Sequence, residues 1–197
     1  MLNRAGPETA LRLPYKRVVK CTVDEEYLGE FGIGGTGDGQ FWWPSALAFD
    51  SEDRLYVADE ALQRVSIFTK AGELLGQWGS HGSQDGQLDS PSAMALDSED
   101  NMYLTDSLNH RVQKFTAEGR LLLHWGSFGD GDGEFNQPWG VAVDSAGNVY
   151  VADWRNDRVQ KFTSGGVFLG KFGLPGSGEG QFHRPAGVAV DPEGRIY

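Results

Sequence analysis

What this sequence of 197 residues lacks excludes several protein classes. Its single cysteine, Cys21, leaves no internal disulfide and no cysteine-based zinc site. No segment has the length and apolar character of a transmembrane helix, and residues 1–16 contain no apolar core of a signal peptide. There is also no Asn-x-Ser/Thr glycosylation site. We therefore expect a soluble protein that contacts no membrane and is cytoplasmic by default.

Positive charge is also scarce. The chain has 28 Asp and Glu against 17 Lys and Arg, a formal net charge of −11. Nucleic acid is bound by neutralising its phosphates, so an acidic surface disfavours it as a partner. Arg155, Arg184 and His183 form a small local exception to this balance.

The sequence is instead rich in repetition, because it repeats every 47 residues without insertion or deletion. The period is visible in Pro44, Pro91, Pro138 and Pro185, and in Tyr56, Tyr103, Tyr150 and Tyr197. A fixed period of this length indicates one supersecondary unit copied in series.

Each copy has the pattern of four short β-strands. In the third copy, the apolar runs at 139–144 and 149–152 flank a turn and predict a hairpin. The run at 158–163 alternates as a half-buried strand does, and 167–172 follows a Ser-Gly-Gly turn. No window shows helical periodicity with caps. The fold class is therefore all-β, and four antiparallel strands per repeat are typical of a β-propeller blade.

Aromatic residues recur at two positions of the repeat and are expected to pack between neighbouring blades. They are Phe68, Phe115 and Phe162 at one position, and Trp78, Trp125 and Phe172 at the other. Cys21 takes the position of Phe68 in the incomplete first copy, which predicts a buried thiol.

The repeat pattern resembles the NHL repeat. The third copy carries it nearly whole, in Gly133, Phe135, Pro138, Gly140, Asp144, Gly147, Asp153, Asn156, Arg158 and Phe162. The first full copy departs most, with Leu62 in place of Asn and Ala46 in place of Gly. The resemblance covers 17–197 and implies a propeller, typically six-bladed in this family. It also implies a recognition module of the kind found in tripartite-motif ubiquitin ligases, bacterial sensor kinases and secreted proteins.

The repeat divides the chain into a propeller and a leader that we expect to be poorly ordered. The leader is 1–16, and the propeller consists of an outer half-blade 17–32, full repeats 33–79, 80–126 and 127–173, and an inner half-blade 174–197. The two half-blades could close a four-bladed ring. We favour an open, partial propeller of about four blades, whose bare apolar end faces would promote self-association.

Two sets of charged residues recur with the period. The first set pairs an aspartate with an arginine five residues later, in Asp59 and Arg64, Asp106 and Arg111, and Asp153 and Arg158. Its recurrence in every full copy favours a structural turn cap and ion pair over catalysis. The second set is the acidic series Asp38, Asp85, Asp132 and Glu179. A ring of carboxylates could hold Ca²⁺, but solvated turn residues are the favoured interpretation, so no cofactor is expected, with Ca²⁺ or Zn²⁺ as the alternative.

The positions where one copy differs from the others predict a binding rim. In a propeller with this strand order, the loop entering the first strand and the loop between the second and third strands open on the same face. Bulky side chains in these loops should therefore cluster there: Trp42, Trp43, Trp139, Trp154, Arg155, His183 and Arg184. Aromatic and arginine side chains are typical anchors of interfaces. The alternative is that some of these indoles only plug the spaces between blades.

Catalysis has little support in the sequence. The four histidines, His81, His110, His124 and His183, occupy different repeat positions without metal-ligand spacing, and no nucleophile lies beside an evident base. No catalytic residue is predicted. We favour a non-enzymatic module that binds a partner protein, peptide or small ligand on the rim. The alternatives are a lyase or hydrolase with a metal in the central channel, as on related propellers, and an RNA-binding domain, which the acidic charge disfavours.

Overall fold

The computed structural model describes residues 3–4, 9–12 and 16–197, and the side chains from residue 16 onward. Its strands form four four-stranded antiparallel sheets, which we call the first to fourth blades. The first blade contains β1 (Asn3–Arg4), β2 (Thr9–Arg12), β3 (Val18–Thr22) and β4 (Tyr27–Phe31). The second contains β5 (Pro44–Phe49), β6 (Leu55–Asp59), β7 (Arg64–Phe68) and β8 (Leu74–Trp78).

The remaining blades repeat this pattern. The third contains β9 (Pro91–Leu96), β10 (Met102–Asp106), β11 (Arg111–Phe115) and β12 (Leu121–Trp125), and the fourth contains β13 (Pro138–Val143), β14 (Val149–Asp153), β15 (Arg158–Phe162) and β16 (Phe168–Phe172). Short 3-10 turns, η1 (Ser107–Asn109) and η2 (Trp154–Asn156), join the second and third strands of the last two blades. Beyond β16, β17 (Leu174–Pro175) pairs in parallel with β18 (Gln181–Phe182).

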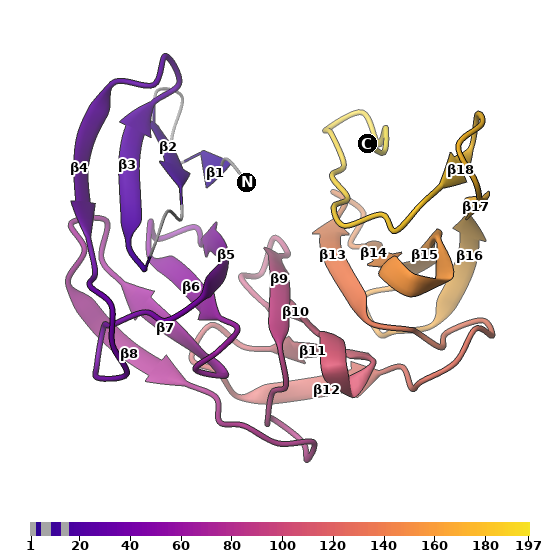
Figure 1. Ribbon diagram of the computed structural model, residues 1–197, viewed down its shortest axis with the longest axis horizontal. Helices are drawn as coiled ribbons and strands as arrows, with labels where there is room; N and C mark the ends of the chain where they lie inside the picture. Colours follow the sequence, from indigo (N-terminus) through magenta and orange to yellow (C-terminus); the bar gives the residue numbers. More distant parts are fainter. Residues whose placement is uncertain (1–2, 5–8, 13–15) are drawn as a thin grey trace.

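The blades follow one another along an arc that does not close (Figure 1). The first strands of successive blades lie on its inner side, where the Ser45 hydroxyl donates to the Pro91 carbonyl at 2.6 Å. The first blade and the C-terminal segment lie at the two open ends. The predicted all-β, partial propeller of about four blades is confirmed.

The first blade contains strands from the segment expected to be a leader. β2 pairs with β3 in the position that β6 holds beside β7. The register differs, however: Tyr56 lies opposite Ile67, whereas their repeat equivalents Thr9 and Lys20 are not partners, and Lys20 lies opposite Leu11. β2 is thus shifted by two residues from the register of the second blade. The rest of the expected leader, 1–2, 5–8 and 13–15, lies outside the described residues.

The core consists of aromatic contacts between blades. The indole of Trp78 lies 4.5 Å from the ring of Phe115 in the next blade, and that of Trp125 lies 5.6 Å from Phe162. Both phenylalanines are fully buried, as the repeat predicts. These contacts bury the apolar face of each blade against its neighbour, which is the main source of stability in a repeat array.

Glycine lets the outer turn of one blade approach the tryptophan of the blade before it. Gly119 has a φ of +84°, and a Cβ there would lie 2.3 Å from the Trp78 ring. Gly166 has a φ of +79°, and a Cβ there would lie 2.8 Å from Trp125. A side chain at either position would strain the backbone and displace the indole. Glycine therefore recurs at this position of the repeat because each blade packs closely against the one before it.

Candidate binding face at the loop end of the blades

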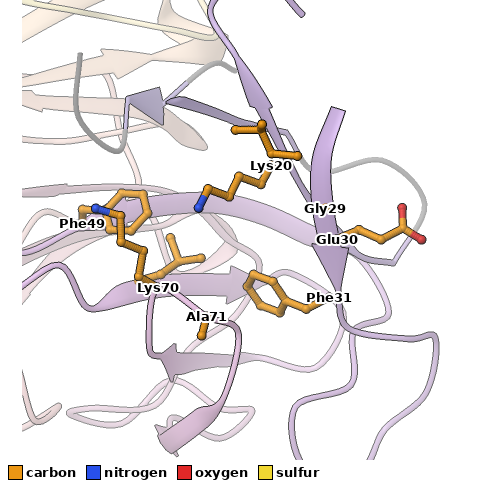
Figure 2. A pocket seen from close by; sticks show the side chains of 9 residues that line it. Lys20, Gly29, Glu30, Phe31, Phe49, Lys70 and Ala71 are labelled. Atoms are coloured by element: carbon orange, nitrogen blue, oxygen red, sulfur yellow. The ribbon is translucent and has the colours of Figure 1, made fainter. Parts of the chain in front are cut away.

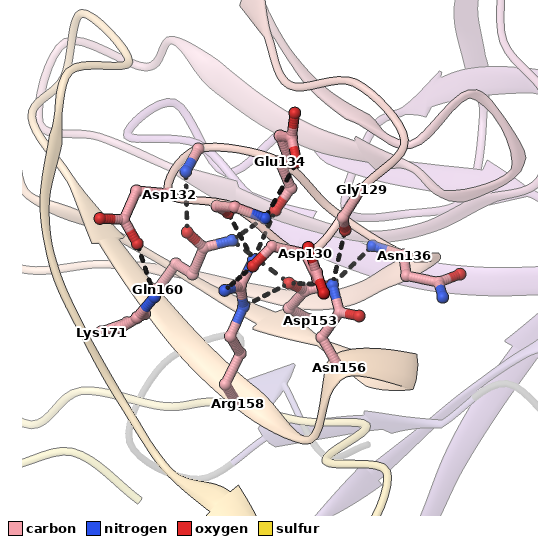
Figure 3. A network of polar contacts seen from close by, with 12 residues as sticks. Gly129, Asp130, Asp132, Glu134, Asn136, Asp153, Asn156, Arg158, Gln160 and Lys171 are labelled. Carbon is pink, nitrogen blue, oxygen red and sulfur yellow. Dashed lines mark hydrogen bonds and ion pairs between the residues drawn. The ribbon is translucent and has the colours of Figure 1, made fainter.

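A buried carboxylate anchors the loops of the fourth blade (Figure 3). Oδ2 of Asp153 accepts hydrogen bonds from Arg158 Nε at 2.8 Å, Asn156 Nδ2 at 2.9 Å and Gln160 Nε2 at 3.2 Å. Its Oδ1 accepts from the backbone N–H of Asn136 at 2.8 Å. The side chain of Asp153 is 0% exposed and that of Arg158 is 8% exposed. The carboxylate thus joins the entry loop of the blade to the loop between its second and third strands.

The third blade repeats this network residue by residue. Asp106 Oδ2 accepts from Arg111 Nε at 2.7 Å, Asn109 Nδ2 at 2.9 Å and Gln113 Nε2 at 3.0 Å. The backbone N–H of Asp89 donates to its Oδ1 at 2.6 Å. Burial raises the pKa of Asp106, and its hydrogen-bond donors and the Arg111 charge oppose that shift.

The second blade departs from this arrangement. Leu62 and Ser66 stand where the third and fourth blades have asparagine and glutamine, so two amide donors are lost. Asp59 instead accepts from backbone N–H groups, including that of Trp42 at 2.6 Å. Arg64 turns its terminal nitrogens to backbone carbonyls, and its buried Nε has no hydrogen-bond partner among the described residues. Asp59 and Arg64, both described, form no ion pair, unlike the pairs Asp106–Arg111 and Asp153–Arg158.

The acidic series does not converge on one point. Asp38 accepts from Gln77 at 2.8 Å, Asp85 lies 3.1 Å from His124, and Asp132 lies 2.6 Å from Lys171. Each carboxylate thus reaches the outermost strand of its own blade, and Glu179 is exposed. From residue 16 onward, where side chains are described, no group of three or more His, Cys, Asp or Glu side chains is placed to hold a metal ion. The Ca²⁺ or Zn²⁺ alternative stays a prediction.

The two kinds of loop expected to share a face are in contact. The backbone N–H of Glu60 donates to the Trp43 carbonyl at 2.8 Å, and that of Arg155 donates to the Asn136 carbonyl at 3.1 Å. Residues of both loops are therefore displayed at the same end of the blades.

Four of the rim residues come together at the end of the fourth blade. The rings of Trp139 and Trp154 are 5.8 Å apart. The guanidinium carbons of Arg155 and Arg184 lie 5.2 Å and 5.1 Å from the centre of the Trp154 ring. Both indoles are half-buried, both arginines are exposed, and neither arginine forms an ion pair with a described residue. We call these four side chains the Trp–Arg cluster.

The position of Arg184 is set by a joint between blades. Its backbone N–H donates to Asp157 Oδ1 at 2.6 Å. The same joint recurs as Ser90 N–H to Gln63 Oε1 at 2.7 Å and Gln137 N–H to His110 Nδ1 at 3.1 Å. The loop backbone that carries Arg184 is therefore held by the same hydrogen bond as in the preceding blades.

Two of the other predicted rim residues lie apart from the cluster. Trp42 and Trp43, at the entry of the second blade, are 43% and 62% exposed. Trp42 lies under Lys16, whose Nζ is 3.5 Å from the ring centre, and among the described residues neither indole contacts the cluster rings. His183 is exposed next to Arg184.

Lys16 contacts a rim residue, Trp42, although it lies within the expected leader and is not among the predicted rim residues. The repeat period could have identified this position, because Lys16 precedes the loop residue Gln63 by one period. Both residues have a left-handed backbone, with φ of 68° and 55°. A lysine cannot accept the hydrogen bond that Gln63 accepts, and its ammonium contacts Trp42 instead.

Comparison with known proteins supports the repeat assignment. Residues 135–162 match the family model of the NHL repeat. The match lies in the fourth blade, and the four blades together form a partial β-propeller whose repeats resemble the NHL repeat. No curated protein matches the chain in sequence. No described helix is long and apolar enough to cross a membrane.

Solved structures share the fold at low sequence identity. A streptogramin B lyase superposes with a TM-score of 0.64 at 16% identity, over 86% of this chain and 51% of that one. A catalytically inactive virginiamycin B lyase from Staphylococcus aureus with quinupristin gives 0.70 at 13%, over 96% and 59%. The nidogen/laminin complex gives 0.63 at 18%, over 94% and 66%. The chain thus spans between about half and two thirds of the length of these proteins, and the likeness shows the fold alone.

Proposed function

We propose that this propeller segment is a non-enzymatic recognition module that binds a partner protein or peptide through the Trp–Arg cluster. The observation that supports it most is the pair of exposed guanidinium groups beside Trp154 without an ion-pair partner among the described residues. In a chain of net charge −11, most of the other arginines whose side chains are described are neutralised by a carboxylate or bound to backbone carbonyls.

The chemistry of the cluster suits a carboxylate next to an apolar side chain. Arginine and tryptophan are enriched among residues whose truncation costs an interface 2 kcal/mol or more. The arginines would supply planar donors to a carboxylate, and the two indoles would cover an apolar side chain of the partner. A small ligand with these two groups is the alternative occupant of the same rim.

An enzyme on this scaffold has weaker support. Two of the similar structures are lyases by name, but at 13% and 16% identity their activity does not transfer to this chain. Metal analysis of the purified protein separates the two proposals. We expect no stoichiometric metal, and one equivalent of tightly bound Zn²⁺ or Ca²⁺ would favour a lyase or hydrolase with a metal in the channel.

The cluster can be tested by capture of partners on the immobilised chain. We expect the double variant Trp154→Ala/Arg184→Ala to lose partners by roughly 30-fold, the equivalent of about 2 kcal/mol. Arg184 is exposed and Trp154 is half-buried at the loop surface, so the variant should stay folded with a modest fall in the unfolding midpoint.

Leu169→Ala provides a matched control, because this leucine is 51% exposed on β16, away from the loops. Equal capture by wild type, the control and the double variant would contradict the assignment of the rim.

A further inference from the structure

A second candidate site lies between the first and second blades, at their outer side (Figure 2). It is a cavity of about 210 Å³ with an apolar wall that includes Phe31, Phe49 and Leu55. Two lysines, Lys20 from β3 and Lys70 from the turn after β7, also line it. At about 30 Å³ per water, its volume is that of roughly seven waters, which suits a small organic molecule.

The next pair of blades provides an internal comparison. An equivalent cavity of about 310 Å³ lies between the second and third blades. One period along the chain, Ile67 takes the place of Lys20, Ala117 that of Lys70, and Glu118 that of Ala71. Both pairs of blades thus have this space, but only the first has lysines at these two positions. The second cavity is lined by another cation, Arg54, whose guanidinium is held by Asp50 at 2.5 Å.

Lys20 lacks the partners that neutralise its equivalent in the third blade. There, Lys114 Nζ lies 3.1 Å from Asp97 and 4.8 Å from the centre of the Tyr103 ring. In the first blade, the residue opposite Lys20 on β2 is Leu11, which supplies neither a carboxylate nor a phenol. Lys20 accordingly has no ion-pair partner among the described side chains.

The other charges leave the cavity positive. Glu30 is bound by Arg17 at 2.8 Å, and its carboxylate points away from the cavity (Figure 2). Lys70 lies 3.1 Å from Asp53, but both side chains are exposed and such pairs are weak. A ligand carboxylate can therefore compete for Lys70 without breaking a buried ion pair.

We propose that this cavity binds a small carboxylic acid with a flat apolar body. The carboxylate would lie between the ammonium groups of Lys20 and Lys70, and the apolar body would lie against Phe31 and Phe49. An apolar wall with a few polar groups that fix orientation is the usual composition of a small-molecule site. This site is independent of the Trp–Arg cluster and of the function proposed for it.

Binding can be measured with phenylacetate as the probe, by following backbone amide NMR shifts of the protein. We expect saturable shifts at Leu28, Phe31 and Ala71 with a Kd on the order of 1 mM, which is typical of a fragment of about ten atoms. Lys20→Ile and Ala71→Glu should each weaken binding at least tenfold. Both variants introduce a residue type found at the equivalent position of the second cavity, so the fold should tolerate them.

Three controls define the chemistry. Phenylacetamide, which lacks the charge, should bind at least fivefold more weakly, and inorganic phosphate, which lacks the apolar body, should not compete at equal concentration. Lys171→Ala, which removes an exposed lysine on β16, should leave binding unchanged. The triple variant Ile67→Lys/Ala117→Lys/Glu118→Ala should create a second site in the other cavity.

The proposal is overturned if Ala71→Glu binds phenylacetate as wild type does, if phosphate binds as tightly as phenylacetate, or if the shifts lie elsewhere. Should Lys20→Ile fail to fold, Ala71→Glu and the triple variant still decide the question.

Discussion

The second and fourth blades have the same four-stranded arrangement but different polar networks. In both, an aspartate accepts a backbone N–H of the entry loop, from Trp42 in one and Asn136 in the other. Only in the fourth blade does the aspartate also hold an arginine. The carboxylate therefore has two separable roles, loop anchor and counterion. The anchor is retained where the ion pair is absent, so the loop stays in place while the residues it displays vary.

The largest expected effect comes from removing the carboxylate where it is a counterion. Asp153→Ala leaves the buried Arg158 charge unpaired, so it should lower the free energy of unfolding by about 3–5 kcal/mol. Asp59→Ala leaves backbone N–H donors without an acceptor but leaves no cation without a counterion. It should lower the free energy of unfolding by about 1–3 kcal/mol. Urea unfolding followed by tryptophan fluorescence measures both.

Double-mutant cycles sharpen this difference. The coupling free energy between Asp153 and Arg158 should exceed that between Asp59 and Arg64, which we expect to be near zero. Equal coupling in the two blades would show that the carboxylate has one role and not two.

A smaller effect is expected from rebuilding the missing donors. Leu62→Asn with Ser66→Gln restores the two amides that hold Asp153 in the fourth blade, and should draw Asp59 toward the unsatisfied Arg64 Nε. We expect a gain of about 1 kcal/mol in the free energy of unfolding.

The reverse exchange, Asn156→Leu with Gln160→Ser, should destabilise the fourth blade by more than the graft stabilises the second. A graft that lowers stability would mean that Leu62 contributes more by packing than the amides contribute by hydrogen bonding.

The smallest expected effect concerns the hydrogen bonds that join neighbouring blades. Burial lowers the pKa of His110 below its ordinary 6.5, and the neutral ring accepts the Gln137 N–H. Because the folded pKa is below the unfolded one, this contribution is complete above pH 6.5 and is lost as the pH falls through the folded pKa. Wild type should therefore lose more stability between pH 7 and pH 5 than His110→Gln, by less than about 1 kcal/mol.

Gln63 holds the equivalent joint without titrating, which makes glutamine the natural replacement. Thermal unfolding of both proteins across this pH range gives the comparison. Parallel curves would show that protonation of His110 is not linked to folding.

The sequence period was sufficient to predict the strands of the second to fourth blades, their order and the aromatic contacts between blades. It was also sufficient to mark Leu62 as a departure, because the other copies show asparagine there. The hydrogen bonds of Arg64 to backbone carbonyls could not be predicted from the period, because every residue has a backbone carbonyl and the sequence does not mark which one is used. β1 and β2 were missed for a related reason: neither carries the repeat pattern, and only pairing with β3 defines them.

The candidate sites were predictable to different degrees. The members of the Trp–Arg cluster lie in loops that share a face, so their positions in the repeat were sufficient to predict that they lie on the same rim. The cavity requires side chains from two different blades, Lys20 and Lys70, each unremarkable within its own repeat. Their chemistry becomes visible only when the two blades are stacked.

The joints between blades also bear on how the chain folds. The three joint hydrogen bonds each connect residues 27 positions apart in the chain. The entropy lost in closing a loop of this length is modest and is the same at each step. Assembly can therefore begin at any pair of blades and spread to its neighbours, without a single long-range contact that has to form first.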